Sequence, residues 1–168
     1  MRIIGIDPGL QRTGWGIIDV QGNKLTHISH SVIKTDPKAP MAERLLQIFD
    51  ELTQQMKLWQ PKEAAIEETF VNKNAKSSLL LGQARGVALM APAKLELTVA
   101  EYPANLVKKS VVGAGHAQKE QIQAMIKILL PGVEASSDAA DALAVAICHA
   151  NHSSSKALMG GIMSGGSR

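Results

Sequence analysis

The sequence predicts an α/β protein built on a five-stranded mixed sheet flanked by helices. Three strand-like segments follow one another at the N-terminus, and helices alternate with strands over the rest of the chain. Hairpin strands followed by crossover helices place antiparallel and parallel neighbours in one sheet, with helices on its faces. A length of 168 residues and an apolar fraction of 45% suit one domain with a sizeable core. We therefore expect one domain over residues 1–150 and a flexible tail over 151–168.

The first three strands are predicted from short segments separated by turn signals. Arg2–Asp7 is an apolar run that ends in an acid, as expected of a buried strand. Trp15–Val20 is the second strand, and Gln21–Asn23 has the composition of a hairpin turn. Lys24–Lys34 is then the third strand, which pairs with the second.

Helical periodicity begins after the third strand. Apolar side chains recur at helical spacing over Met41–Trp59, which predicts an amphipathic helix of about five turns. A fourth strand, Ala64–Glu67, again ends in an acid. Leu79–Ala91 is a second helix, for which Ser77 or Ser78 is a suitable cap.

The last part of the chain adds one strand and three helices. Leu95–Tyr102 is predicted as the fifth strand, Pro103–Lys109 as a short helix and Lys119–Leu130 as a longer one. Ser136–Ala150 is apolar on nearly every side, so we expect a buried helix. From Asn151 onward the chain is rich in Ser and Gly, which predicts a tail without a core.

Composition narrows the class of protein. A net charge of +3 and a pI near 9.1 are compatible with a polyanionic partner, although many basic proteins bind no nucleic acid. The single cysteine, Cys148, excludes an intrachain disulfide and favours a reducing compartment. The opening MRIIGID does not resemble a signal peptide, and no apolar run reaches membrane-spanning length. We expect a cytoplasmic protein.

Four acids lie at the ends of apolar segments: Asp7, Glu67, Asp138 and Asp141. Taken singly, they have ordinary explanations. Asp7 precedes a Pro-Gly turn, and Asp138 and Asp141 fit the N-cap and N3 positions of a capping box. Glu67 lies beside Glu68 at a strand end that could face water. Asp7 and Glu67 end strands, where functional sites form in open α/β sheets. If the apolar segments pack together as predicted, all four acids could converge in one small pocket.

Four carboxylates in one pocket would raise one another's pKa, and a hard divalent cation would relieve that cost. Oxygen ligands alone suit Mg²⁺ or Mn²⁺. Zinc is disfavoured, because His149 and His152 lie three residues apart without a cysteine cluster or a second histidine pair to join them. The simpler explanation places these histidines at a helix end that meets a polar tail. A pair of metal ions can clamp the attacking and leaving oxygens of a phosphodiester. A mildly basic domain with this cluster predicts a metal-dependent nuclease.

Four motifs in order closely resemble the RuvC family of Holliday-junction resolvases. They are IIGIDPGLQRTGWGII, AIEETFVNKNAKSSLLLGQARGVAL, VKKSVVGAGHAQKEQI and DAADALAVAICH, and the similarity covers about Arg2–Ala150. The resemblance implies a ribonuclease H-like fold and a homodimer. It also implies a Mg²⁺-dependent endonuclease that nicks two strands of like polarity symmetrically at four-way DNA junctions. RuvA and RuvB, the branch-migration proteins, would be its partners.

The resemblance also assigns residues. The family's catalytic acids match Asp7, Glu67, Asp138 and Asp141, which would hold two Mg²⁺ ions per site, with Mn²⁺ able to substitute. Its important lysines match Lys108 and Lys119, and its aromatic residue beside the site matches Phe70. Glu68 replaces the usual glutamine, and the apolar register of Ala64–Glu67 favours Glu67 as the inward-facing acid.

Further DNA contacts are predicted from charge and position. Phe70 would stack against a junction base, unless it anchors its loop in the core. The candidate phosphate contacts, some of which could be plain surface charges, are Lys73, Lys76, Arg85, Lys108, Lys109 and Lys119.

The helix Leu79–Ala91 carries small residues that would suit a dimer seam or the core. Two other functions compete with the nuclease. A sugar-kinase or actin-like ATPase would need two lobes and a longer chain, and a non-catalytic junction-binding protein would be expected to lack at least one of the four acids.

Overall fold

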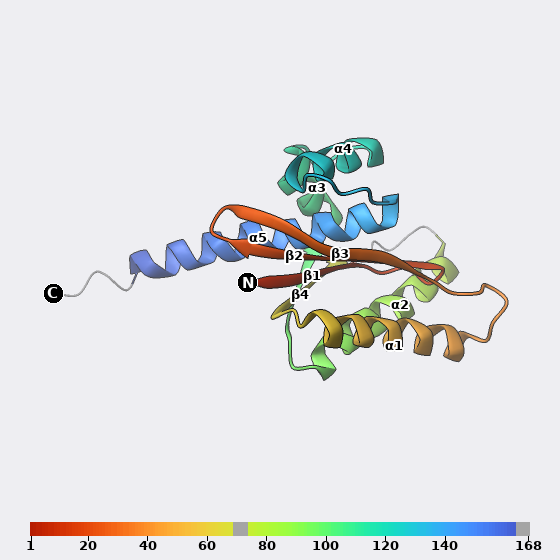
Figure 1. Ribbon diagram of the computed structural model, residues 1–168. Helices are drawn as coiled ribbons and strands as arrows, with labels where there is room; N and C mark the ends of the chain where they lie inside the picture. Colours follow the sequence, from red (N-terminus) through yellow and green to blue (C-terminus); the bar gives the residue numbers. More distant parts are fainter. Residues whose placement is uncertain (69–73, 164–168) are drawn as a thin grey trace.

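The protein is a layered α/β structure, shown in Figure 1 as a computed structural model. It describes residues 1–68 and 74–163, with side chains as far as Ser153. The helices are α1 (Met41–Trp59), α2 (Ala75–Lys94), α3 (Ala104–Val112), α4 (Lys119–Leu129) and α5 (Ser137–Met163). Helices α1 and α2 cover one face of the sheet, α5 lies on the other, and α3 and α4 pack against α5 (Figure 1). Within the described residues, no helix is long and apolar enough to cross a membrane.

The sheet has five strands in the order β3-β2-β1-β4-β5, which confirms the predicted mixed sheet. The strands are β1 (Arg2–Asp7), β2 (Arg12–Gln21), β3 (Lys24–Lys34), β4 (Glu63–Glu68) and β5 (Thr98–Pro103). β1 is central; it runs antiparallel to β2 and parallel to β4. Ile6 pairs with Ile66. The next residues, Asp7 and Glu67, therefore lie together at one edge of the sheet, where parallel strands end.

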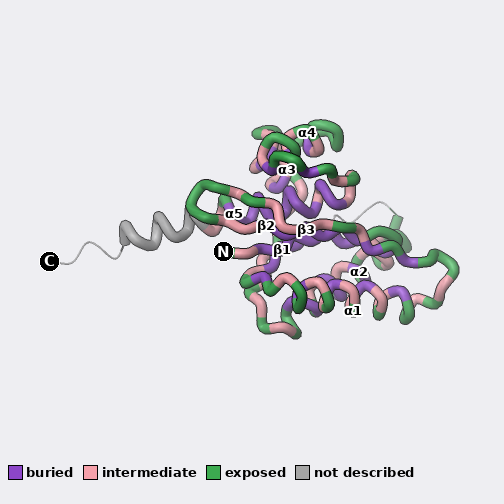
Figure 2. The backbone as a smooth tube through the Cα atoms, in the orientation of Figure 1, coloured by how far each residue is buried: buried purple, intermediate pink, exposed green. Residues whose placement is uncertain are grey.

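Alternate residues of the central strand enter two separate cores. Ile3 packs against α5, whereas Ile4 and Ile6 pack toward α1 and α2. All three side chains are fully buried, and Figure 2 shows the same burial along the central strands and α5. This is the arrangement expected of a sheet covered on both faces, because successive side chains point to opposite sides.

Glycines allow α5 to lie unusually close to the sheet. A Cβ atom at Gly5 would stand 2.1 Å from the backbone oxygen of Ala142. At Gly14 it would stand 2.0 Å from the backbone oxygen of Asp138. Only glycine fits such an approach, so these two positions set the distance between the end of the sheet and the first turns of α5.

Several predicted boundaries differ from the structure. β2 begins at Arg12 rather than Trp15, because Arg12 still pairs with Lys34 of β3. Neither Ser77 nor Ser78 caps α2: the helix begins at Ala75, and the Asn74 side chain accepts hydrogen bonds from its first turn. Asn competes well with Ser as a cap, so the sequence alone did not separate them.

The remaining boundaries also shift. β5 begins at Thr98 rather than Leu95, and α3 ends at Val112 rather than Lys109. α5 continues past Asn151, where the sequence predicted a tail, as far as Met163. Adding residues to a formed helix costs far less than starting one, which favours this continuation.

The capping-box explanation for Asp138 and Asp141 is wrong. The backbone N–H of Ala140 donates to the Ser136 carbonyl, so Ser136 is the cap and Asp138 lies within the first turn.

His149 was expected at a helix end that meets a polar tail, and this prediction is wrong. It is 5% exposed, and its ring nitrogens lie 2.8 Å from the Tyr102 hydroxyl and 2.5 Å from a Glu63 carboxylate oxygen.

Candidate active site

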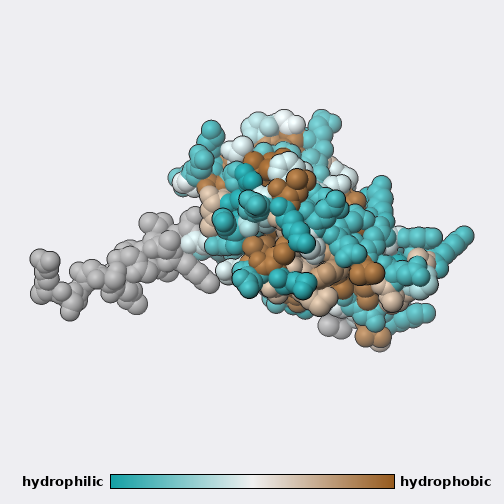
Figure 3. Space-filling model, turned by 60° about the horizontal axis from the view of Figure 1, so that its bottom comes forward, coloured by the Kyte–Doolittle hydropathy of each residue, from teal (hydrophilic) through white to brown (hydrophobic). Residues whose placement is uncertain are grey.

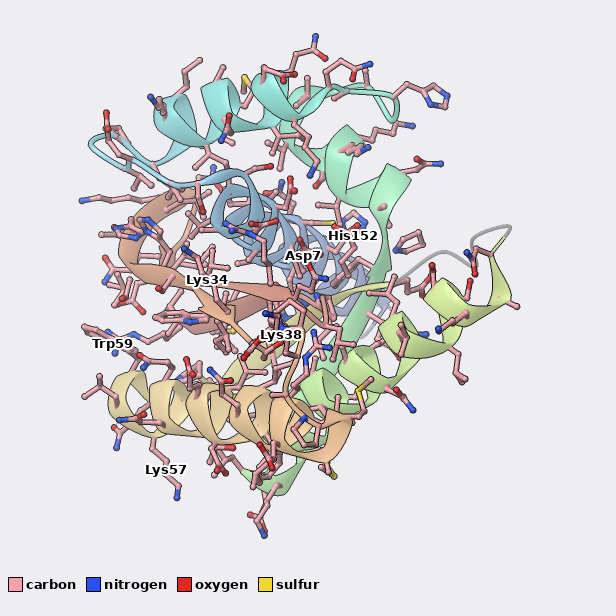
Figure 4. The ribbon with its side chains drawn as sticks, turned by 90° about the vertical axis from the view of Figure 1, so that its right-hand side faces the viewer. Asp7, Lys34, Lys38, Lys57, Trp59 and His152 are labelled. Carbon is pink, nitrogen blue, oxygen red and sulfur yellow. The ribbon has the colours of Figure 1, made fainter. Side chains whose placement is uncertain are left out.

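A pocket of about 230 Å³ lies at the edge of the sheet where β1 and β4 end. Asp7 reaches it from β1, Glu67 from β4 and Asp141 from α5. Lys108 of α3 and Lys119 of α4 line its opposite wall. Figure 4 views this edge, with Asp7 between the sheet and the helices above it. Five elements far apart in sequence therefore each supply one charged side chain.

Burial and, after it, mutual repulsion raise the pKa of each pocket carboxyl above its ordinary value. Burial, together with the charges of Glu67 and Asp141, raises the pKa of Asp7 to about 8. Burial also raises the pKa of Glu67 to about 7, with Asp141 adding to the shift and the two lysines opposing it. The pKa of Asp141 is raised by burial as well, against the lowering effect of Lys119. Shifts of this kind mark functional sites more often than chance.

Asp138 is the one predicted acid that does not line the pocket. Its carboxylate accepts a hydrogen bond of 2.5 Å from the Nε group of Arg12, at the start of β2. Lys119 Nζ, by contrast, lies 4.0 Å from Asp141. Asp138 and Asp141 are on the same side of α5, and the Asp138 charge contributes to the raised pKa of Asp7. The structure thus brings three acids together and holds the fourth beside them.

The donor set fits a hard divalent cation. The acidic side chains of the pocket offer carboxylate oxygens only, which suits Mg²⁺ or Mn²⁺ rather than zinc. Their pKa values are raised first by burial and then by mutual repulsion, and a cation would offset both costs of the charged form. Across the described residues, no three His, Cys, Asp or Glu side chains already enclose one metal position. The carboxylates share the pocket without converging on a single point.

Residues 3–149 match the family model described as crossover junction endodeoxyribonuclease RuvC. The chain belongs to the RuvC family. A RuvC of Paramagnetospirillum magneticum is 59% identical, with 90% of this chain and 92% of that protein covered. A RuvC of Rhodopseudomonas palustris is 60% identical, with 90% of this chain and 88% of that protein covered.

Solved structures agree with this membership of the RuvC family. Thermus thermophilus RuvC in complex with Holliday junction substrate superposes with a TM-score of 0.84 at 32% identity, covering 91% of this chain and 94% of that one. The yeast mitochondrial Holliday junction resolvase, at 15% identity and a TM-score of 0.63 over 88% and 77% of the chains, shares the fold. The predicted ribonuclease H-like fold is confirmed.

The other predicted DNA contacts of this RuvC-family chain are scattered. Lys76 is exposed in the first turn of α2, and Lys109 is exposed on α3 beside Lys108. Arg85 forms an ion pair with Glu101 of β5, which already satisfies part of its charge. Phe70 and Lys73 lie outside the described residues. The roles of these side chains stay predictions.

Sequence reasoning missed Arg12 as a member of the site. The residue stood in a predicted turn, and its partner Asp138 lies 126 positions away. The only signal was a cation close after Asp7 in a chain whose acids cluster. A pairing at such separation follows from the register of β2 and the docking of α5, neither of which a local pattern contains.

Proposed function

We propose that this chain resolves four-way DNA junctions by metal-dependent hydrolysis of phosphodiester bonds. The observation that carries the proposal is the pocket in which Asp7, Glu67 and Asp141 face Lys108 and Lys119, within a chain of the RuvC family. Membership of that family makes the chain a crossover junction endodeoxyribonuclease. We further propose Mg²⁺ as the metal and paired symmetric nicks, in strands of like polarity, as the outcome.

Asp7, Glu67, Asp138 and Asp141 are the residues that would hold the metal, two ions per site. When bound, the metal supplies an activated water and stabilises the leaving oxygen. Asp7 ends the central strand, and it would be shared between the two ions if both were bound. Asp7, Glu67 and Asp141 are half-buried at the ends of β1 and β4 and on the first turns of α5.

The two lysines balance the charge that DNA brings to this pocket. A phosphodiester entering a site with three carboxylates would be repelled without cations close by. Lys108 and Lys119 face those carboxylates, and Lys119 already lies 4.0 Å from Asp141. They would hold the scissile phosphate against the acids, which is a positioning role that requires no proton transfer.

A non-catalytic junction-binding protein remains the alternative function. Nothing about junction binding alone requires buried carboxyls whose pKa is raised at a strand edge. The convergence of Asp7, Glu67 and Asp141 therefore favours the enzyme over the binding module.

The test is cleavage of a synthetic four-way junction, with and without Mg²⁺, resolved on a denaturing gel. We expect metal-dependent nicks at symmetric positions with the wild-type chain. Asp7→Asn should lose cleavage by at least about a hundredfold while it still binds the junction, because only the metal ligand is removed. Asp50→Asn, an exposed acid on α1, is the matched control. Full activity in Asp7→Asn would refute the assignment.

A homodimer is part of the proposal, because two equal sites match the two-fold symmetry of paired cuts. An exposed stripe on α2 suits the seam. Leu79 and Met90 are 66% and 53% exposed, and Cβ atoms at Gly82 and Gly86 would meet nothing within 4 Å. The other small residues of the predicted seam, Ala84 and Ala88, are instead buried in the core. Figure 3 shows apolar patches on the α1–α2 side of the molecule.

RuvA and RuvB complete the proposed setting. Branch migration moves the crossover, and a resolvase needs a junction delivered to its site, so these proteins are the partners that the family resemblance implies. The cytoplasmic location expected from the sequence belongs to the same proposal.

A further inference from the structure

A second pocket, of about 290 Å³, is lined in part by Arg12, the partner of Asp138. It is shaped by the ends of β2 and β3 and by the loop and first turn that begin α5. No acidic side chain is among its described lining residues, in contrast to the active-site pocket. Those residues are Arg12, His30, Ser31, Val32, Lys34, Ser136 and Ala139.

The two strongest cations of this basic pocket stand directly opposite each other. Arg12 of β2 and Lys34 of β3 are register partners in the antiparallel ladder. Partners in such a ladder project from the same face of the sheet, and like charges at directly opposed positions are destabilising. Asp138 offsets the charge of Arg12, whereas Lys34 forms no salt bridge with a described residue, so a negative ligand between the two side chains would relieve their repulsion.

Arg12 and Lys34 both have hydrogen-bond donors that remain available to a ligand. Arg12 donates through Nε to Asp138, and this is its one hydrogen bond within the described part of the chain. A guanidinium has five N–H donors, so the outer groups stay available. The Lys34 ammonium forms no salt bridge with any described residue. Lys34 lies at the same end of the sheet as Asp7, because Asp7 pairs with Gly14 of β2 and Arg12 of β2 pairs with Lys34.

His30, which also lines the basic pocket, has a structural role and not a binding role. His30 lies 2.8 Å from the His27 ring through Nδ1 and 3.2 Å from the Glu134 carbonyl through Nε2. Both of its nitrogens are engaged, so it serves as a wall that joins β3 to the loop before α5. The binding capacity of the pocket is left to Arg12 and Lys34.

We propose that the basic pocket binds a backbone phosphate of a junction strand, at a position away from the scissile bond. The inference rests on the proposed function and extends it with a second anchoring point. Arg12 links the two places, because it contacts Asp138 on one side and lines the basic pocket on the other. A strand held at both points would be fixed in direction as well as position, since two phosphate contacts define a line.

The first experiment measures junction binding without divalent metal, so that cleavage does not interfere. Lys34→Gln should weaken binding about fivefold to tenfold at 0.1 M salt. It should also lower the slope of log K against log salt by about 0.9, the value for one lost phosphate contact. Lys24→Gln, at the other end of β3, is the matched control and should change neither quantity. Both side chains are exposed, so both variants should fold, with melting temperatures no lower than wild type.

The second experiment locates the contact. Single methylphosphonates remove the charge of one DNA phosphate at a time, and each is tested with wild type and Lys34→Gln. We expect one position, outside the cleaved linkage, at which the modification weakens wild-type binding but leaves Lys34→Gln unaffected. If every methylphosphonate weakened junction binding equally for both proteins, Lys34 would contact no single phosphate and would act only through long-range electrostatic attraction. That result would overturn the proposal.

Different results would refute the phosphate-binding proposal for the basic pocket and the proposed nuclease function. Wild-type affinity and salt slope in Lys34→Gln, together with normal metal-dependent cleavage by wild type, would remove the basic pocket and leave the junction nuclease standing. Absence of cleavage by the wild-type chain under any divalent metal would remove the proposed function itself.

Discussion

Asp7 is the residue at which the needs of folding and of chemistry conflict most. Its carboxyl is buried beside two other acids, and its pKa in the folded protein is about 8. An unfolded chain would release that proton near pH 3.9. Between these values the folded state holds a proton that the unfolded state lacks, so rising pH favours unfolding. Without metal, this contribution to stability falls from about pH 4 to about pH 8 and stays low above it.

Asp7→Asn should therefore stabilise the metal-free protein. Asparagine keeps the shape and has no proton to lose, so the variant should exceed wild type by roughly 1–3 kcal/mol at pH 8 and by little at pH 4. Urea unfolding in EDTA across this pH range measures the difference. Asp50→Asn, on the exposed side of α1, should show no such trend. A constant difference at all pH values would contradict the origin assigned to the shift.

Some residues of the site could be predicted from the sequence around them, and others could not. Asp7 and Glu67 were predictable, because each ends an apolar strand and carboxyl ends of strands share an edge. Of the adjacent glutamates, Glu67 lines the pocket, as the strand register had favoured. The pairing of Asp138 with Arg12 was not predictable, because it depends on how α5 docks against β2.

At the scale of elements, the contact between α5 and the sheet sets the geometry of the site. Gly5→Ala would place a methyl group 2.1 Å from the Ala142 backbone oxygen, so α5 would have to move. We expect a loss of stability of at least about 1–3 kcal/mol, with a further loss of cleavage because Asp141 moves with the helix. Chemical denaturation and the junction assay measure the two effects.

Gly82→Ala is the matched control for the effect on stability alone, because Gly82 lies in the proposed dimer seam. It introduces the same methyl group on α2, where no atom lies within 4 Å. Alanine favours a helix over glycine by up to about 1 kcal/mol, so stability should be unchanged or raised. Equal effects of the two substitutions would show that packing at Gly5 is not the cause.

Element types were predictable and element ends were less so. Periodicity identified α1 and the buried start of α5, since both patterns are long and unambiguous. The ends depended on competition between neighbouring caps, as with Asn74, or on ladder pairing, as with Arg12. The contacts of His149 with Glu63 and Tyr102 could not be predicted, because both partners are far from His149 in the sequence.

At the scale of the whole molecule, the proposed dimer gives a separable prediction. Glutamate in place of both Leu79 and Met90 would put charge into the exposed stripe of α2 without entering the core. We expect the double variant to sediment as a monomer and to nick junctions singly instead of in pairs, because each molecule then has one site. Leu46→Glu, on an equally exposed leucine of α1, is the control and should remain dimeric. A monomeric wild-type protein at working concentration would contradict the dimer.

The architecture as a whole followed from the order of segments. Three consecutive strands and then alternation leave few sheets that obey the usual connection rules, and the observed mixed sheet is one of them. The seam of a dimer could not be read in the same way. Gly82 and Ala84 look equivalent in the sequence, yet one is open to solvent and the other is fully buried.

The late position of α5 in the chain has a consequence during synthesis. Asp7 and Glu67 leave the ribosome long before Asp138 and Asp141, which arrive on the last helix of the chain. Chains fold from the N-terminus as they emerge, so the strands can pair while the acids of α5 are still unmade. A chain that ended before α5 would lack Asp138 and Asp141. Under the proposed assignment of the four acids, we expect such a chain not to cut DNA, so that nuclease activity would begin only after α5 is translated.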